Sequence, residues 1–270
     1  MEKLELHDGG YLQYEWDTGG GGLPVVFLNG ILMNLRSWNG QRPVLSEARP
    51  CLLHDFRGQL YSSKELPEAH RLEGHVSDTK ALLDHLGIRR CHLVGTSYGG
   101  EVALLFAKAY PEQVQSLSVI ASVSYSDGLL QRQVRLWDKL SRVDAGLLYD
   151  AVVSTSYSAA FLERHGNFLD MRRQDFEQLP AAFFTGFQKL CAAFLAFQLS
   201  DEALAQISAP ALIIAAEHDI LKPPHYSERM AEAMPHSEYV CLKGAGHAVV
   251  IEQPKTINPI LRGFIEKNEP

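Results

Sequence analysis

The sequence predicts an α/β protein with a mostly parallel sheet, flanked by helices and interrupted by one helical insertion. Short, continuous apolar runs alternate with segments of helical periodicity, which is typical of parallel strands covered by helices on both faces. This alternation stops in the middle of the chain and resumes toward the C-terminus. With 270 residues, the chain has room for one large domain or two small ones, and one core with an insertion is the first arrangement to test.

The first half of the chain is expected to supply five strands and two helices. The strand signal is a short apolar run, and the helix signal is apolar residues spaced three and four apart. Gly87 and Pro111 mark the ends of the two helices. The expected strands are 11–16, 24–28, 51–54, 91–94 and 117–121, and the expected helices are 72–86 and 100–110.

The middle of the chain is expected to form the insertion. Between 122 and 208 the sequence has helix-like stretches rich in phenylalanine and no clear strand. We therefore expect an α/β core formed by 1–121 and 209–270, with 122–208 packed on it as a lid. The elements expected after the insertion are strands at 211–215 and 239–242 and helices at 224–234 and from 253 onward.

Composition limits the classes of function. The chain is 46% hydrophobic and 21% charged, with a mean hydropathy of -0.10, which fits a globular protein and excludes disorder. A net charge of -7 disfavours binding to nucleic acid or an anionic membrane and favours a small-molecule substrate. No apolar run approaches the roughly 20 residues that cross a bilayer. Residues 1–10 lack a signal-peptide pattern, so a cytoplasmic location is expected.

Neither a metal nor a cofactor is expected. The eleven histidines show no HExxH or other metal-ligand spacing. The cysteines are far apart in the sequence and lack the spacing of a zinc or redox motif, so we interpret them as reduced core residues. They are Cys51, Cys91, Cys191 and Cys241.

The main chemical signal is a G-x-S-x-G pattern centred on Ser97, between an expected strand and an expected helix. A serine on such a tight turn adopts a strained backbone, and Gly95 and Gly99 remove side chains that would clash there. The hydroxyl is then presented above the carboxyl edge of the sheet, where helix N–H groups stabilise developing negative charge. The alternative is a glycine-rich turn with an incidental serine, because the pattern alone is weak.

A serine nucleophile needs a histidine base and a carboxylate that orients the histidine. Asp219 follows a strand-like run, and His247 follows the last expected strand, so Ser, Asp and His occur in the order that this topology requires. Other acidic and histidine residues nearby are interpreted as surface or helix-capping groups. These rivals are Glu217, His218, His225 and His236.

These motifs resemble the α/β-hydrolase family over nearly all of the chain. The likeness rests on 84–87, 94–100 and 252–254, together with Asp219, Pro223 and Gly246-His247. It implies an α/β-hydrolase fold with a mostly parallel eight-stranded sheet, flanking helices and a helical lid. It also implies that Ser97 is the nucleophile, His247 the general base and acid, and Asp219 the orienting carboxylate. Branches with an aspartate nucleophile are disfavoured because position 97 is serine.

The expected oxyanion hole departs from the family pattern. Asn29-Gly30-Ile31 stands where the family usually has His-Gly. The backbone N–H groups of Ile31 and Tyr98 are still expected to form the hole, because main-chain donors do not depend on the side chain and glycine permits the turn. Asn29 is expected either to contact the substrate or to brace the loop.

A short likeness to acyltransferases suggests a second activity and a partner. In the loop 55–62, Leu60 replaces a family glycine. The Gly-Gln step of this loop, together with Asn29-Gly30, resembles bacterial acyltransferases that join hydroxyacyl groups from acyl carrier protein into lipid precursors. Basic residues spaced three and four apart form one helix face, which is either a solvated surface or a dock for an acidic carrier protein. They are Arg132, Arg135, Lys139 and Arg142.

The insertion is expected to roof the substrate pocket. It contains eight phenylalanines, most of which we assign to the core of the lid itself. Phe183, Phe184 and Phe187 are the ones expected to contact an apolar acyl or ring-bearing substrate.

The sequence therefore predicts a serine hydrolase that cleaves an ester-like bond of an apolar or acyl small molecule through an acyl-enzyme on Ser97. Two alternatives stay open. One is the acyltransferase, and the other is a ligand-binding protein that retains the triad with negligible turnover, because a fold alone does not dictate function.

Overall fold

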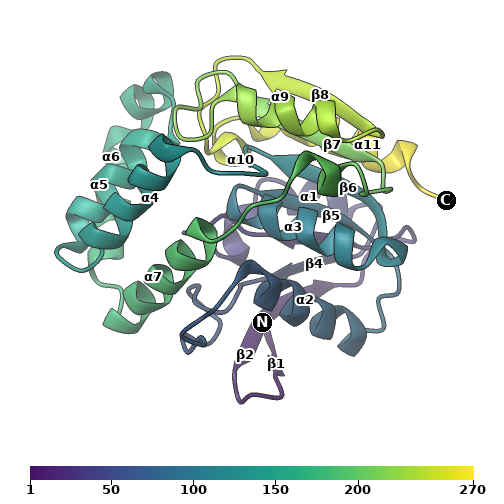
Figure 1. Ribbon diagram of the computed structural model, residues 1–270, viewed down its shortest axis with the longest axis horizontal. Helices are drawn as coiled ribbons and strands as arrows, with labels where there is room; N and C mark the ends of the chain where they lie inside the picture. Colours follow the sequence, from purple (N-terminus) through teal and green to yellow (C-terminus); the bar gives the residue numbers. More distant parts are fainter.

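The computed structural model describes residues 1–270 and places eight strands in one sheet, in the order β1-β2-β4-β3-β5-β6-β7-β8 (Figure 1). β2 pairs antiparallel with both β1 and β4, and every other pair is parallel. The prediction of an α/β fold with a mostly parallel sheet is confirmed. The strands are β1 (Glu2–Glu5), β2 (Tyr11–Asp17), β3 (Val25–Leu28), β4 (Cys51–His54), β5 (Cys91–Thr96), β6 (Val114–Ile120), β7 (Ala211–Ala216) and β8 (Ser237–Leu242).

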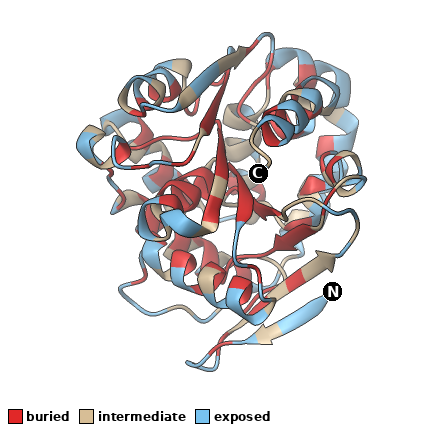
Figure 2. Ribbon diagram, turned by 90° about the vertical axis from the view of Figure 1, so that its right-hand side faces the viewer, coloured by how far each residue is buried: buried red, intermediate tan, exposed pale blue.

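The central strands lie in the interior because their sequences are apolar toward both faces of the sheet. Every residue of β3, β5 and β7 is buried, which explains why these segments are continuous apolar runs and do not alternate. Figure 2 shows the buried strands in red at the centre of the molecule, with exposed residues on the outer sides of the helices. The sequence does not predict β1, because this four-residue edge strand is mostly charged and exposed.

Helices cover both faces of the sheet and enclose two separate apolar clusters. α2, α3 and α9 pack on one face, whereas α1, α10 and α11 pack on the other. Their bounds are α1 (Arg42–Ser46), α2 (Leu72–His85), α3 (Tyr98–Ala109), α9 (Pro224–Ala233), α10 (Val249–Glu252) and α11 (Pro254–Lys267), and two short 3-10 helices are η1 (Leu35–Trp38) and η2 (Pro111–Gln113).

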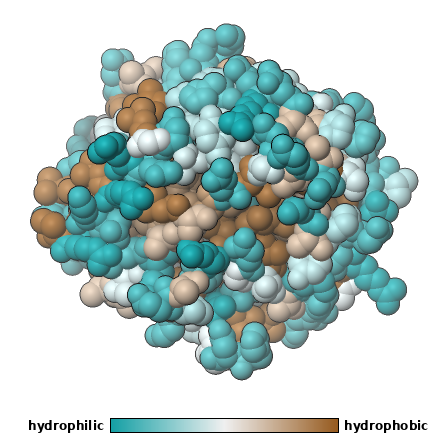
Figure 3. Space-filling model, viewed as in Figure 1, coloured by the Kyte–Doolittle hydropathy of each residue, from teal (hydrophilic) through white to brown (hydrophobic).

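Five further helices connect β6 to β7 and lie within 122–208. They are α4 (Gly128–Leu140), α5 (Ala145–Ser156), α6 (Ala159–Glu177), α7 (Ala181–Leu195) and α8 (Asp201–Leu204). α4 to α7 stand together beside the sheet at the left of Figure 1. In Figure 3, brown apolar side chains appear among the teal ones over these helices, which carry the exposed Leu129, Leu136, Leu147 and Phe168. No helix combines the length and the apolar character that a membrane span requires.

A buried histidine links the stability of this core to pH. His54 ends β4, is fully buried, and neither of its ring nitrogens has a hydrogen-bond partner. Burial lowers the pKa of His54 from 6.5 to about 4. Between pH 6.5 and 4, the unfolded chain takes up a proton on this residue, whereas the folded chain keeps His54 neutral. Proton uptake therefore favours the unfolded chain, and the free energy of unfolding decreases as the pH falls from 6.5 toward 4.

We expect His54→Leu to flatten the dependence of the unfolding free energy on pH between 6.5 and 4. Removing one proton-uptake site lowers the slope by about 1.4 kcal/mol per pH unit. Urea denaturation at several pH values measures this slope. An unchanged slope in His54→Leu would contradict the assignment.

Candidate active site

Ser97 occupies a strained turn between β5 and α3. Its φ of 51° and ψ of -120° lie outside the regions that most residues adopt. A Cβ atom on Gly95 would lie 2.3 Å from the backbone oxygen of Gly99, and one on Gly99 would lie 2.0 Å from that of Leu28. Only glycine fits at these two positions, so the local sequence permits the turn. The turn presents the Ser97 hydroxyl at the carboxyl end of β5, next to the N-terminus of α3.

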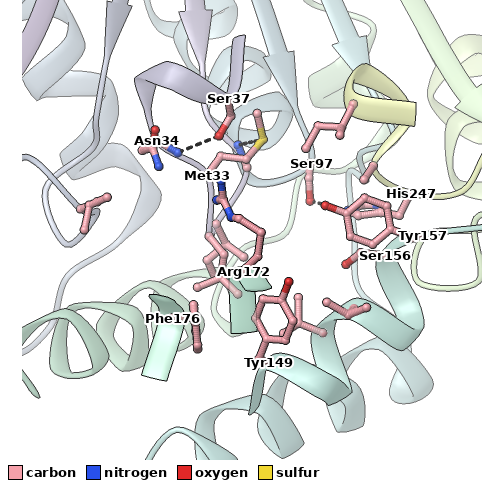
Figure 4. Close-up of a pocket in the computed structure, with 18 of the residues that line it drawn as sticks. Met33, Asn34, Ser37, Ser97, Tyr149, Ser156, Tyr157, Arg172, Phe176 and His247 are labelled. Atoms are coloured by element: carbon pink, nitrogen blue, oxygen red, sulfur yellow. Dashed lines mark hydrogen bonds between the residues drawn. The ribbon is translucent and has the colours of Figure 1, made fainter. Parts of the chain in front are cut away.

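Ser97, His247 and Asp219 form a continuous hydrogen-bonded chain. Nδ1 of His247 lies 2.7 Å from Oδ2 of Asp219. Nε2 of His247 lies 2.9 Å from Oγ of Ser97, and Figure 4 shows these two residues at the cavity. The other carboxylate oxygen of Asp219 accepts hydrogen bonds from the backbone N–H groups of Leu221 and Lys222, at 2.9 and 2.7 Å. These two bonds fix the carboxylate with Oδ2 toward the imidazole. The structure thus brings together the three residues that the sequence assigns to the triad.

The rival acidic and histidine residues lie away from this chain. Glu217 accepts hydrogen bonds from the side chain of Lys243 and the backbone N–H of Gly244 at the surface. The three remaining rivals, His218, His225 and His236, are all exposed. Their placement agrees with the interpretation of these residues as surface groups.

The loop that follows β3 brings a backbone donor to Ser97. Ile31 lines the same cavity as Ser97, and its N–H donates to no acceptor in the structure. Tyr98 is the first residue of α3, where a backbone N–H has no acceptor within the helix. Nε2 of Gln59 donates to the carbonyl oxygen of Gly30 at 2.7 Å and holds this loop in place.

Asn29 braces the loop and does not reach the cavity. Its side chain is fully buried, and Nδ2 donates to the backbone oxygen of His54, to Oδ1 of Asp55 and to Oε1 of Gln59 at 3.0 to 3.1 Å. Oδ1 of Asn29 accepts from Nε1 of Trp38 at 2.8 Å. Because every polar atom of this side chain is already bonded, the expectation that Asn29 contacts the substrate is wrong, and the bracing alternative agrees with the structure.

Asn29→Ala should therefore lower the stability of the fold clearly and affect turnover only indirectly, through the geometry of the loop. The substitution leaves the buried Nε1 of Trp38 without an acceptor, and we expect the free energy of unfolding to fall by about 1 to 3 kcal/mol. Turnover should fall far less than in Ser97→Ala. Urea denaturation and steady-state kinetics on one preparation test this. Equal losses of turnover in the two variants, with circular dichroism unchanged, would make Asn29 a catalytic group.

A cavity of about 640 Å³ lies over Ser97 and His247. Nineteen of its 30 lining residues are hydrophobic. Most of these come from the loop after β3 and from the segment that holds α4 to α7, and the others come from the loops after β4 and β7 and from the region of α10. Figure 4 shows Met33 and Asn34 on one side of this space and Tyr149 and Phe176 on the opposite side. In the same view Arg172 extends toward Met33, and Tyr157 is drawn over His247. The sequence carried no signal for most of these residues, because their position depends on how the insertion packs against the sheet.

Only one of the three phenylalanines expected at the substrate lines the cavity. Phe183 does so, whereas Phe184 and Phe187 do not. Phe187 is buried with Leu190 on the face of α7 that packs into the core beside the sheet. Phe184 packs edge-to-face against Phe176 and Phe183. The expectation of substrate contact does not hold for Phe184 and Phe187, because their positions on α7 direct both side chains into packing against other side chains and away from the cavity.

Sequence reasoning missed two charged residues beside the nucleophile. Lys222 and Glu101 are buried, and Nζ of Lys222 lies 3.2 Å from Oγ of Ser97. The only sequence signal is a lysine in the loop that carries Asp219, just before Pro223. The structure contains no group of three or more His, Cys, Asp or Glu side chains placed to hold a metal ion, and its four cysteines are unpaired.

A mostly parallel eight-stranded sheet with a serine on a strained strand-to-helix turn is the architecture of the α/β-hydrolase fold. The alpha/beta hydrolase fold family matches residues 24–254, and the chain belongs to that family. This match, together with similar proteins that are named as hydrolases, identifies the chain as an enzyme of the α/β-hydrolase type.

Similar proteins extend this likeness over nearly the whole chain. "Putative carbamate hydrolase RutD" of Pantoea ananatis (strain LMG 20103) is 31% identical over 252 residues, covering 90% of this chain and 88% of that protein. The crystal structure of MGS-M2, an alpha/beta hydrolase enzyme from a Medee basin deep-sea metagenome library, superposes with a TM-score of 0.93 at 28% identity, covering 98% of this chain and 97% of that one. The enol-lactonase of Burkholderia xenovorans LB400 shares the fold at a TM-score of 0.88 and 24% identity, over 98% of this chain and 100% of that one.

Proposed function

We propose that this chain is a serine hydrolase that cleaves an ester-like bond of a small acyl compound through an acyl-enzyme on Ser97. The observation that carries the proposal is the hydrogen-bonded chain from Ser97 through His247 to Asp219. This arrangement supplies a nucleophile, a base within reach of its proton, and a group that orients the base.

Each group has a defined part in the reaction. As Oγ of Ser97 attacks the carbonyl carbon, Nε2 of His247 takes the hydroxyl proton, and the carboxylate of Asp219 stabilises the imidazolium that forms. His247 then gives this proton to the leaving group, and the acyl-enzyme remains. Water, deprotonated by the same nitrogen, attacks the acyl-enzyme and releases the acid.

The backbone N–H groups of Ile31 and Tyr98 are proposed as the oxyanion hole. Both are free of partners within the loop or helix, and they flank the Ser97 turn from β3 and α3. Two such donors stabilise the negative charge that develops on the carbonyl oxygen.

The mostly hydrophobic cavity favours an acyl compound with an apolar part. A volume of about 640 Å³ accommodates a small molecule of this kind. The relatives named RutD direct attention to carbamates as a second candidate, since the attack of Ser97 on a carbamate carbonyl would follow the same steps. Turnover of an aryl acyl ester compared with the aryl carbamate of the same leaving group separates the two.

Covalent labelling tests the proposal directly. A fluorophosphonate should add once to the protein, and peptide mass spectrometry should place the adduct on Ser97. The labelled protein should have lost its turnover of aryl esters. Absence of an adduct on Ser97, or turnover that survives complete labelling, would overturn the proposed mechanism.

The acyltransferase stays an alternative, because it shares every step up to the acyl-enzyme. The basic residues of its proposed dock are all exposed. Arg132, Arg135 and Lys139 lie on α4, and Arg142, two residues after the end of α4, forms an ion pair with Asp138. Mass spectrometry after mixing with 3-hydroxyacyl carrier protein decides between free acid, which supports hydrolysis, and an ester-linked dimer. The carrier-protein partner, the lid function of 122–208 and the cytoplasmic location stay predictions.

A further inference from the structure

A buried ion pair lies directly behind the nucleophile. Nζ of Lys222, in the loop after β7, lies 2.7 Å from Oε1 of Glu101, in the first turn of α3. The side chains are 4% and 0% exposed, and neither residue lines the substrate cavity. Burying two charges costs free energy that their attraction often fails to recover, so a buried pair is weak evidence for a role in stability.

The ammonium of Lys222 also contacts the reacting atom. Nζ lies 3.2 Å from Oγ of Ser97, on which Nε2 of His247 also converges at 2.9 Å. An ammonium is a donor only, so Oγ accepts from Lys222 while its own proton points to His247. Oγ therefore holds both bonds at once.

Glu101 and its neighbours fix the position of Lys222. Oε1 of Glu101 also accepts from Oγ of Ser122 at 2.7 Å and from the backbone N–H of Val123 at 3.3 Å. Burial raises the pKa of Glu101, and the charge of Lys222 and these hydrogen bonds oppose that rise. The ring of Phe194, 5.0 Å from Nζ, covers the ammonium. Lys222 is thus held in place before any substrate binds.

We propose that Lys222 is a fourth catalytic group, whose ammonium stabilises negative charge on Oγ of Ser97. This inference rests on the proposed function. In acylation, the proton of Oγ passes to Nε2 of His247 as the bond from Oγ to the carbonyl carbon forms, and Lys222 keeps all three of its protons. In deacylation, that bond breaks, and Oγ leaves with the electron pair and takes the proton back from His247. The bond from Lys222 strengthens as Oγ gains charge, so it favours both transition states.

Two variants test this role. Lys222→Met removes the ammonium but leaves Glu101 as an unpaired buried charge, whereas Lys222→Met/Glu101→Gln removes both charges and leaves a neutral, similarly filled site. Both variants lose the hydrogen bond from a charged donor to the reacting oxygen. We therefore expect kcat and the rate constant of fluorophosphonate inactivation to fall by about 10- to 100-fold in each. KM for an aryl ester should change by less than about twofold, because Lys222 does not line the cavity.

A second ion pair nearby provides the matched control. Lys243 and Glu217 lie 2.8 Å apart on the surface of the same group of loops, and Lys243→Met/Glu217→Gln should leave both rates unchanged. If the Lys222→Met/Glu101→Gln protein melts at the wild-type temperature and reacts at the wild-type rate, the pair is only structural and the inference is wrong. A rise in KM with unchanged kcat also overturns it. Failure of the wild-type protein to label at Ser97 would instead overturn the proposed function, and this inference with it.

Discussion

Ser97→Ala is expected to lower kcat/KM for an aryl ester by up to about 10⁶-fold and to abolish fluorophosphonate labelling. The loss is this large because, in the proposed mechanism, the covalent intermediate forms on Ser97. Since Ser97 and His247 act as one unit, Ser97→Ala/His247→Ala should be no worse than either single variant. Stopped assays at high enzyme concentration, with intact-mass analysis, measure both effects.

Ser156→Ala is the matched control, because Ser156 lines the same cavity and its hydroxyl makes no hydrogen bond in the structure (Figure 4). The turnover and the labelling of Ser156→Ala should stay within about threefold of wild type, because Ser156 makes no bond to the reacting atoms. Labelling that persists in Ser97→Ala, or is lost in Ser156→Ala, would mean that the nucleophile is misassigned.

The alternation of elements was predictable because it depends on local sequence and on burial. Continuous apolar runs such as those of β3, β5 and β7 are typical of strands covered on both faces, and the structure confirms that these segments are buried strands. β1 was not predictable, because it is an edge strand held by pairing with β2 and has little apolar character of its own. Because β1 forms only by pairing with β2, the residues of β1 alone do not predict it.

The meeting of Ser97, Asp219 and His247 could be predicted for a similar reason. Each lies at the carboxyl end of a parallel strand, and these ends meet at one edge of the sheet, so chain order alone specifies the meeting. The environment of Oγ could not be predicted. Lys222 reaches it only because Glu101 and Ser122, distant in the sequence, form a buried polar site there. Phe187 points into the core for the same kind of reason, since the packing of α7 decides its direction.

Asp219→Asn is expected to lower kcat by about 10⁴-fold without disturbing the fold. In the structure, Oδ1 of Asp219 accepts from two backbone N–H groups, so an asparagine keeps its oxygen there and turns its NH₂ group toward His247. Nδ1 of His247 must then accept a hydrogen bond, which places the ring proton on Nε2. A protonated Nε2 donates to Oγ of Ser97 and has no lone pair with which to take its proton.

Glu217→Gln is the control for this prediction. Glu217 lies in the same loop but forms hydrogen bonds with Lys243 and Gly244 at the surface. Replacing its carboxylate with an amide should therefore change kcat by less than about twofold. The reverse order of effects would make Glu217 the orienting acid. The tautomer argument also predicts which step fails: Asp219→Asn should lower the rate of fluorophosphonate inactivation as much as kcat, because both begin with transfer of the Ser97 proton to His247. Inactivation at the wild-type rate would show that Asp219 acts after the attack and not through the state of the imidazole.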